Sequence, residues 1–440
     1  MPHAKRKVNA NPTKEFFVSM LVKDLLLKQA IIELIDNSID GARTIRNCDY
    51  KGLYIHVKFN GTEFSIEDNC SGISLDLAQN SAFRFGRPKT HKTLDRETTG
   101  IFGIGMKRAL FKMGNYFEIT SATKDESFKI ELDVEEWVSD QNQEWDFPFS
   151  EYHENQTNQQ TGTKILVRNL NKEIKSEFTD PAFEKELIEH IERRVGLSMS
   201  YNLEITVNEK QLKGNNVKII DTEGVHPIIK EYKDTGVYVK IICGIAAREG
   251  TKYAPENAGW YIYCNERLIV AADKTSLTTW KDMENKNSGV LFHNDYAPFR
   301  GIVFFNSNSP ELMPWNTTKT SIDETSHLYL RARENMQEAS KAVRIFLDEV
   351  RQNAAQSDDG IKETIAQMES IEINAKNAKS ILPAKKELSI SNIKVKTNPY
   401  VTISYKKPKE EVDQVKKVLA VKSNKAVGEK TFDYYVDAEV

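Results

Sequence analysis

A carboxylate and a carboxamide stand four residues apart in the segment Glu33-Leu-Ile-Asp36-Asn37-Ser-Ile-Asp40-Gly41. If the segment is helical, Glu33, Asn37 and Asp40 share one face of the helix. An amide oxygen is a hard ligand suited to Mg²⁺, and a carboxylate can take a proton from water. The pattern therefore suits metal-assisted attack by water, and it also describes an ordinary solvated helix face.

A second group of residues is the acidic turn Ile66-Glu-Asp68-Asn-Cys70-Ser-Gly72-Ile73. An Asp just beyond a strand end, with a glycine nearby, can present its carboxylate to a pocket. There it can accept a hydrogen bond from an exocyclic amine such as that of adenine. A plain Asp-Asn turn after a strand gives the same pattern.

A third group is the glycine series Gly100-Ile-Phe-Gly103-Ile104-Gly105-Met106-Lys107, which precedes a predicted helix. Its GxxGxG spacing is neither the dinucleotide-binding GxGxxG nor a P-loop. Glycines let a backbone approach a phosphate, and a helix N-terminus supplies free N–H groups and a positive dipole end. The turn therefore suits a phosphate, although alone it does not specify one.

Two further segments carry less information by themselves. Gln160-Thr-Gly162-Thr163-Lys164 places Thr163 at the entrance of a predicted strand. Residues 82–92 are basic and lie between the acidic turn and the glycine series. They suit a lid that closes over phosphates, and equally a solvated flexible loop.

The elements that must position these residues follow from the apolar pattern. Helical spacing predicts helices over residues 20–46 and about 103–114. Strands are predicted over 53–58, 62–67, 116–134 and 163–168, with the hairpin signal Asn60-Gly61 between the first two. This order predicts an α+β fold in which helices pack on one mixed β-sheet.

The rest of the chain is predicted to form a second α/β domain and a small terminal element. Its predicted elements are a helix over 172–198, strands within 203–220, 235–246, 260–267 and 301–305, and a helix over 324–352. Residues 353–396 are polar, and we expect a helix and a linker there. A strand at 401–405, a helix at 408–420 and a strand at 431–436 predict a β-α-β element. About 45 residues is marginal for an independent core, so this element should pack on the main body, a second copy or a partner.

Composition excludes several classes of protein. The 440 residues are 39% hydrophobic and 28% charged with a net charge of −3, which is ordinary for a soluble protein of two or three domains. Four scattered cysteines without CxxC spacing argue against a zinc site or a disulfide framework. No apolar run approaches the roughly 18–20 residues of a membrane span, and the basic start is not followed by a signal-peptide core. We expect a cytoplasmic protein without a membrane partner.

In this order and spacing, the four groups resemble the GHKL superfamily, which includes gyrase B subunits, 90-kDa heat-shock chaperones, sensor histidine kinases and MutL proteins. The resemblance covers residues about 15–170, and the motifs are most similar to those of the MutL, MORC and heat-shock-90 branches. It implies a Bergerat-fold ATPase domain that uses ATP and Mg²⁺.

The resemblance also assigns roles on the predicted helix. Glu33 matches the general base that activates the attacking water, and Asn37 matches the Mg²⁺ ligand that bridges to the phosphates. Asp40 matches a structural or pocket position. The only histidine upstream is His3, so a phosphoacceptor histidine is missing and water is the expected acceptor.

Adenine and phosphate contacts are assigned in the same way. Asp68 matches the residue that bonds the adenine amine, with Thr163 assisting through water. Gly72 and Ile73 match the segment against which the base lies. The phosphate-binding turn is matched by Gly100, Gly103, Ile104, Gly105, Met106 and Lys107. Asn69 or Cys70 stands where the usual Asp-x-Gly-x-Gly has its first glycine, which puts the form of this turn in doubt.

Two later segments resemble the transducer domain of MutL- and gyrase-like proteins. Residues 260–270 are similar to its strand followed by Asn-x-Arg, here Asn265 and Arg267. Residues 314–323 are similar to the loop that places a lysine on the γ-phosphate. Lys319 would then sense the triphosphate and stabilise charge in the transition state. The alternative is an ordinary surface lysine in a turn.

These expectations divide the chain into an ATP-binding domain (1–198), a transducer-like domain related to ribosomal S5 domain 2 (199–352), a polar linker or helical segment (353–396) and the β-α-β element (397–440). The resemblance implies a homodimer that ATP closes. Three targets stay open: DNA, which the lysine-rich residues 385–430 favour; an effector protein in a multi-protein system such as anti-phage defence; and a chaperone client.

Overall fold

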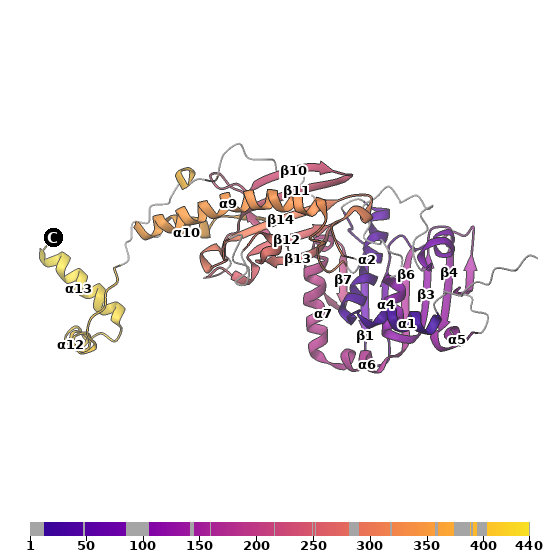
Figure 1. The fold of residues 1–440 in the computed structure, drawn as a ribbon. Helices are drawn as coiled ribbons and strands as arrows, with labels where there is room; N and C mark the ends of the chain where they lie inside the picture. The colour runs from indigo at the N-terminus through magenta and orange to yellow at the C-terminus, as the bar shows by residue number, and fades with distance from the viewer. Residues whose placement is uncertain are drawn as a thin grey trace, which may run out of the picture. The chain divides into compact units, whose positions relative to one another are not determined.

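The computed structural model describes residues 13–46, 49–84, 105–140, 145–158, 160–214, 216–248, 250, 252–280, 290–316, 319–356, 360–373, 388, 390–393 and 403–439. The chain forms two units, residues 1–394 and 395–440. The first unit holds two large β-sheets, each with its own helices (Figure 1). We call residues 13–212 with the first sheet the first module, and residues 217–393 with the second sheet the second module.

The first module is built on a mixed sheet of eight strands in the order β5-β4-β3-β6-β2-β1-β7-β8. The strands are β1 (Tyr54–Phe59), β2 (Phe64–Asp68), β3 (Gly114–Ala122), β4 (Ser127–Asp133), β5 (Phe149–His153), β6 (Gly162–Leu170), β7 (Glu204–Val207) and β8 (Lys210–Gln211). Only β1 and β7 pair in parallel. The side chain of Asn60 accepts hydrogen bonds from the backbone N–H groups of Thr62 and Glu63 and so closes the β1–β2 hairpin. The predicted α+β fold with a mixed sheet is confirmed.

Helices α1 (Lys14–Lys23), α2 (Leu27–Ile45) and α4 (Gly105–Met113) pack against one another over this sheet (Figure 1). Helix α2 buries Ile31, Ile35 and Ile39 at helical spacing in the core of the module. The single helix predicted over 20–46 is two helices, because the chain turns at Asp24 and Leu26 is extended. The other helices of the module are α3 (Leu75–Leu77), the π-helix η1 (Ala78–Ala82), α5 (Val134–Ser139), α6 (Lys172–Thr179), α7 (Pro181–Arg194) and α8 (Gly196–Ser200).

The second module contains a five-stranded sheet in the order β10-β11-β14-β12-β13, with helix α9 (His327–Gln356) packed on it (Figure 1). Its strands are β10 (Ile228–Asp234), β11 (Val237–Ile245), β12 (Gly259–Cys264), β13 (Arg267–Asp273) and β14 (Phe299–Asn306). Strands β12 and β13 form a hairpin whose turn, Asn265 and Glu266, is left-handed with φ of 45° and 68°. The strand predicted over 260–267 therefore crosses this turn.

Contacts in the structure cross two of the expected domain boundaries, at residues 198 and 353. Strand β7 pairs with β1, so the first sheet continues beyond the expected boundary at residue 198. Helix α10 (Gly360–Ala366) packs on α9, and β15 (Ser370–Glu372) pairs with β9 (Lys218–Ile220). The described residues of the expected linker thus belong to the second module, because Ile365, Ile373 and Ile393 are buried in its cores.

The regular structure among the described residues of the second unit, 403–439, is helical. Helices α12 (Lys409–Leu419) and α13 (Asn424–Glu439) pack against each other, and residues 403–408 have no regular structure. The helix predicted at 408–420 is correct, but the strand predicted at 431–436 is wrong because these residues lie inside α13. A strand needs a neighbour for its backbone, whereas a helix satisfies its own N–H and C=O groups. Within the described part of the chain, no helix has the length and apolarity that a membrane crossing requires.

Candidate functional site

Asp68 ends strand β2 as a buried carboxylate held by three donors. Its Oδ2 accepts from the Ser38 hydroxyl at 2.7 Å, and its Oδ1 accepts from the backbone N–H groups of Cys70 at 2.9 Å and Thr163 at 3.2 Å. Burial raises the pKa of Asp68 above its ordinary value, although the three hydrogen bonds oppose the shift. The carboxylate is therefore fixed in direction and kept partly dry, which suits recognition of a polar ligand edge.

The segment after Asp68 is pressed against the neighbouring strands. Gly72 has a φ of +69°, and a Cβ added there would lie 2.0 Å from the carbonyl oxygen of Ala122. Ser121 Oγ accepts from the backbone N–H of Ile73 at 2.8 Å and lies 2.8 Å from Thr163 Oγ1. Gly72, Ile73 and Thr163 thus lie beside Asp68, and position 72 requires glycine.

Helix α2 presents Glu33 and Asn37. Among residues 30–42, only Asn37 is exposed, so its amide faces open space within an otherwise buried stretch of helix. Gly105 begins the described part of α4, and a Cβ added there would lie 2.4 Å from Glu33 Oε2. The end of the glycine series and the carboxylate of the first motif are therefore in contact.

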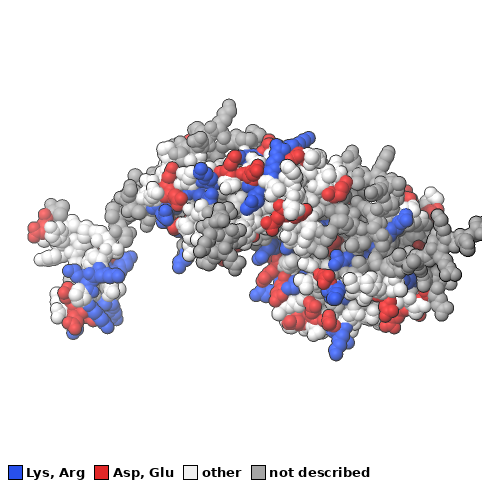
Figure 2. Space-filling model, in the orientation of Figure 1, with Lys and Arg blue, Asp and Glu red and all other residues white. Residues whose placement is uncertain are grey.

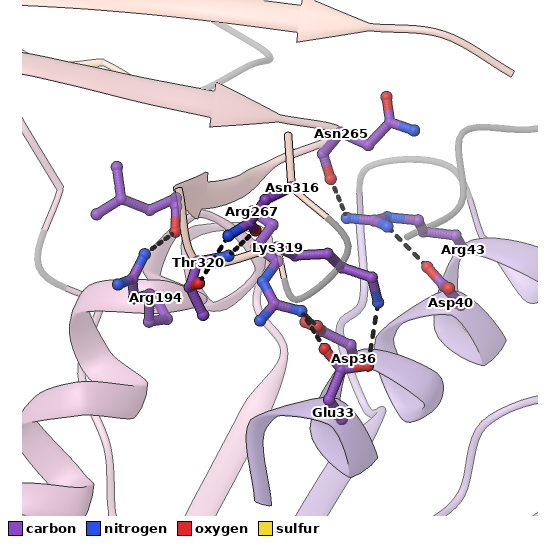
Figure 3. A network of polar contacts seen from close by, with 11 residues as sticks. Glu33, Asp36, Asp40, Arg43, Arg194, Asn265, Arg267, Asn316, Lys319 and Thr320 are labelled. Atoms are coloured by element: carbon purple, nitrogen blue, oxygen red, sulfur yellow. Dashed lines mark hydrogen bonds and ion pairs between the residues drawn. The ribbon is translucent and has the colours of Figure 1, made fainter. Parts of the chain in front are cut away.

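The second module supplies two cations to Glu33 (Figure 3). Lys319 Nζ lies 3.1 Å from Glu33 Oε2, and Arg267 Nη1 lies 3.2 Å from Glu33 Oε1. The same Arg267 nitrogen forms an ion pair with Asp36, one turn along α2. Lys319 and Arg267 are each 4% exposed, so Lys319 is not a surface lysine in a turn.

The loop around Lys319 is braced by Asn316. The Asn316 side chain accepts from the backbone N–H of Thr320 at 2.9 Å, and the Asn316 carbonyl accepts from the N–H of Lys319 at 3.0 Å. Lys319 itself has a φ of +53°, a left-handed conformation that is unfavourable for a residue with a Cβ. Such strain persists where surrounding structure enforces it, and here it aims the ammonium at α2.

Asp40 belongs to a second ionic contact between the modules. Arg43 Nη1 donates to Asp40 at 2.9 Å, and Arg43 Nη2 donates to the Asn265 carbonyl at 2.9 Å (Figure 3). Arg43 Nη2 also contacts Glu266 at 3.1 Å. This contact places Asp40 beside the β12–β13 turn and favours a structural role for Asp40 over a role in the pocket.

Electrostatics at Glu33 are set by competing effects. Burial would raise the pKa of Glu33, but the charges of Lys319 and Arg267 outweigh it and hold the pKa below its ordinary value. Burial also lowers the pKa values of Lys319 and Arg267, against the opposing charge of Glu33. The carboxylate stays ionised because these cations accompany it into the interior.

The remaining residues predicted for the site either lie in the interior of the module or fall outside the described residues. Lys107 is buried, and its ammonium donates to the carbonyls of Ala82 at 3.0 Å and Arg84 at 2.7 Å, while burial lowers its pKa to about 7. Met106 is part of the core. Gly100, Gly103 and Ile104 lie outside the described residues, as does most of the predicted lid.

Sequence reasoning missed several residues of the site. Asp36 stands in the helix motif without an assigned role, and the sequence pattern does not single out Ser38, Arg43 or Ser121. Arg267 is the arginine of the strand-Asn-x-Arg segment, and that pattern is the signal that points to it. Their contacts arise from packing between distant elements, which spacing along one helix does not encode.

Comparison with known proteins agrees with this arrangement. Residues 25–163 match the family of histidine kinase-, DNA gyrase B- and HSP90-like ATPases. No curated protein matches the sequence. The matched segment includes Glu33, Asn37, Asp68 and Thr163, so these residues lie within a GHKL-type ATPase domain.

We predict that Asp68→Asn weakens nucleotide binding without lowering the stability of the fold at pH 7. Because the folded-state pKa of Asp68 is raised, its contribution to stability is complete below the ordinary pKa of 3.8 and is lost as the pH rises through the folded value. Asparagine avoids this loss, and the Ser38 hydroxyl can turn to accept from the new amide. At pH 7 the variant should therefore melt at or above the wild-type temperature while binding ADP much more weakly.

Melting curves between pH 7 and pH 4, with ADP titrations at pH 7, measure both effects. The advantage of the variant should shrink toward pH 4. Strong destabilisation at pH 7, or unchanged ADP affinity, would contradict the assigned role of Asp68.

Proposed function

We propose that this chain, whose residues 25–163 form an ATPase domain of the GHKL superfamily, binds and hydrolyses ATP and that its second module senses the triphosphate. The observation that carries the proposal is the contact of Lys319 from the second module with Glu33 on α2, at 3.1 Å. A lysine this close to the base is within reach of a phosphate that the base must face.

Adenine recognition is assigned to the Asp68 cluster. The exocyclic amine of adenine would donate to the fixed Asp68 carboxylate, and the base would lie against Gly72 and Ile73. Thr163, 2.8 Å from Ser121 Oγ, would order a water between Asp68 and the ring. A charged acceptor strengthens such a bond relative to a neutral one.

The described residues fit a magnesium ion bound together with phosphates. They contain no group of three or more acidic, histidine or cysteine side chains that would hold a metal without further ligands. Asn37 supplies one exposed amide oxygen on α2. Mg²⁺ commonly takes few protein ligands and completes its shell with phosphates and water. When bound, the ion would neutralise phosphate charge.

Hydrolysis is assigned to Glu33. The carboxylate would take a proton from water as the water oxygen bonds to the γ-phosphorus. The bond from that phosphorus to the β–γ bridging oxygen would break, and ADP would leave with the electron pair. Lys319 would move from Glu33 to the γ-phosphate, where its charge stabilises the transition state and frees the carboxylate.

We predict that Glu33→Ala slows ATP turnover by about 10²-fold or more while ATP affinity is retained, because a general base usually contributes this much. Steady-state phosphate release and calorimetric titration measure the two quantities. Turnover close to wild type would assign the base elsewhere.

We further propose that ATP closes two copies of the chain into a dimer. The support is that the nucleotide site is joined to the second module by two ionic contacts, so a change at the phosphates can be passed to that module. The lysines of α12 gather on one part of the second unit (Figure 2), a feature that favours DNA as the target of the closed form.

Molar mass in solution tests dimer closure. A non-hydrolysable ATP analogue should convert monomer into dimer, and ADP should not. If the mass stays constant in all nucleotide states, the dimer proposal is wrong. Adding duplex DNA to the same samples should give a larger, salt-sensitive complex with the analogue, and its absence would favour a protein target.

A further inference from the structure

Arg267 and Lys319 contact different oxygens of the Glu33 carboxylate. Arg267 Nη1 lies 3.2 Å from Oε1, whereas Lys319 Nζ lies 3.1 Å from Oε2 (Figure 3). The same guanidinium nitrogen also pairs with Asp36, which is 2% exposed. One arginine therefore bridges two carboxylates that lie one turn apart on α2.

The two cations differ in how firmly they are held. Arg267 starts β13 directly after Glu266, which pairs with Arg43 at 3.1 Å. Its backbone is thus held at the turn that docks on α2. Lys319 instead lies in a loop with an unfavourable φ and carries a flexible stem. Arginine also keeps its proton in a protein, whereas a buried lysine need not.

Charge balance favours keeping one of these cations at Glu33, to which Arg108 on α4 adds a weaker effect. Glu33 and Asp36 are like charges on adjacent turns, and such pairs repel. Lys319 and Arg267 together balance them. If Lys319 moves to the γ-phosphate, Arg267 is the remaining cation of the second module in contact with both carboxylates. Its bond to Oε1 would then set the direction of Oε2, the oxygen that Lys319 vacates.

We propose that Arg267 is a positioning residue, which acts through Asp36 and Glu33 Oε1 to aim Glu33 Oε2 at the attacking water. The inference rests on the proposed hydrolysis and deepens it. Because Arg267 belongs to the second module, Glu33 is aimed only while the β12–β13 turn is docked on α2. Turnover then depends on module docking even with the adenine pocket filled.

The test compares two Arg→Lys substitutions: one at Arg267, which begins β13, and one at Arg194, which ends α7 and contacts β13. Arg267→Lys keeps a buried positive charge but loses the planar fork that spans two carboxylates. Arg194→Lys is the matched control, because Arg194 donates to the Leu268 and Ile269 carbonyls at 2.7 Å and, among the described residues, contacts β13 through these carbonyls and not through a carboxylate. For each protein, kcat and KM for ATP and the affinity for ADP are measured.

Arg267→Lys should lower kcat about tenfold or more with KM and ADP affinity changed little, the pattern of a lost transition-state interaction. Arg194→Lys should leave kcat within about twofold of wild type, since kcat follows alignment at Glu33 and not hairpin packing alone. Asp36→Asn should lower kcat as well, and the Arg267→Lys/Asp36→Asn double variant should be no slower than the worse single variant.

Three results would overturn the inference alone: wild-type kcat in Arg267→Lys, equal losses in both Arg→Lys variants, or multiplying losses in the double variant. Loss of ADP binding in parallel with kcat would also overturn it, by assigning Arg267 to folding. A wild type that binds ATP without turning it over would instead overturn the proposed hydrolysis, and the inference with it.

Discussion

The junction of the two modules is organised around neutralising one partly buried carboxylate, that of Glu33. Among the described residues, both ion pairs of Glu33 come from the second module, one at each oxygen. An ionised carboxylate taken out of water costs several kcal/mol unless cations and hydrogen bonds accompany it. Docking of the second module on α2 therefore favours the charged form of Glu33. The packing of the two sheets is in this way linked to the chemistry of one helix.

Two local features are consistent with this constraint and unfavourable without it. Lys319 adopts a left-handed conformation, and Gly105 leaves no room for a side chain beside Glu33. Each lets a backbone or cation approach α2 more closely than a relaxed chain would. Strain of this kind collects at sites where position matters more than stability.

Much of the first module could be predicted because its elements carry their own signals. The apolar spacing of α2 and the Asn60-Gly61 hairpin are local, and the order of four motifs is a property of the chain alone. Pairings between distant segments are not local. Strand β7 pairs with β1 in parallel, and β15 pairs with β9, so these pairings cross the boundaries expected at residues 198 and 353. Residues 431–436 are rich in aromatic and β-branched side chains, which favour a strand, yet they are helical, and the described residues of the second unit offer no strand for them to pair with.

The residues of the candidate site likewise fall into those with a local sequence signal and those brought together only by packing. Residue type and order identified Glu33, Asn37, Asp68 and Thr163, and the structure brings Asp68 and Thr163 together and puts Lys319 on Glu33. The bridging role of Arg267 depends on how a hairpin docks against a helix, which the sequence does not encode locally.

The most direct test of the central claim is a crystal structure of the wild type with Mg²⁺ and a non-hydrolysable ATP analogue, compared with one containing ADP. With the analogue, Lys319 should lie on the γ-phosphate, Arg267 should remain on Glu33 and Asp36, and Asp68 should accept from the adenine amine. With ADP, Lys319 should pair with Glu33. A nucleotide bound elsewhere, or Lys319 on Glu33 in both structures, would contradict the account.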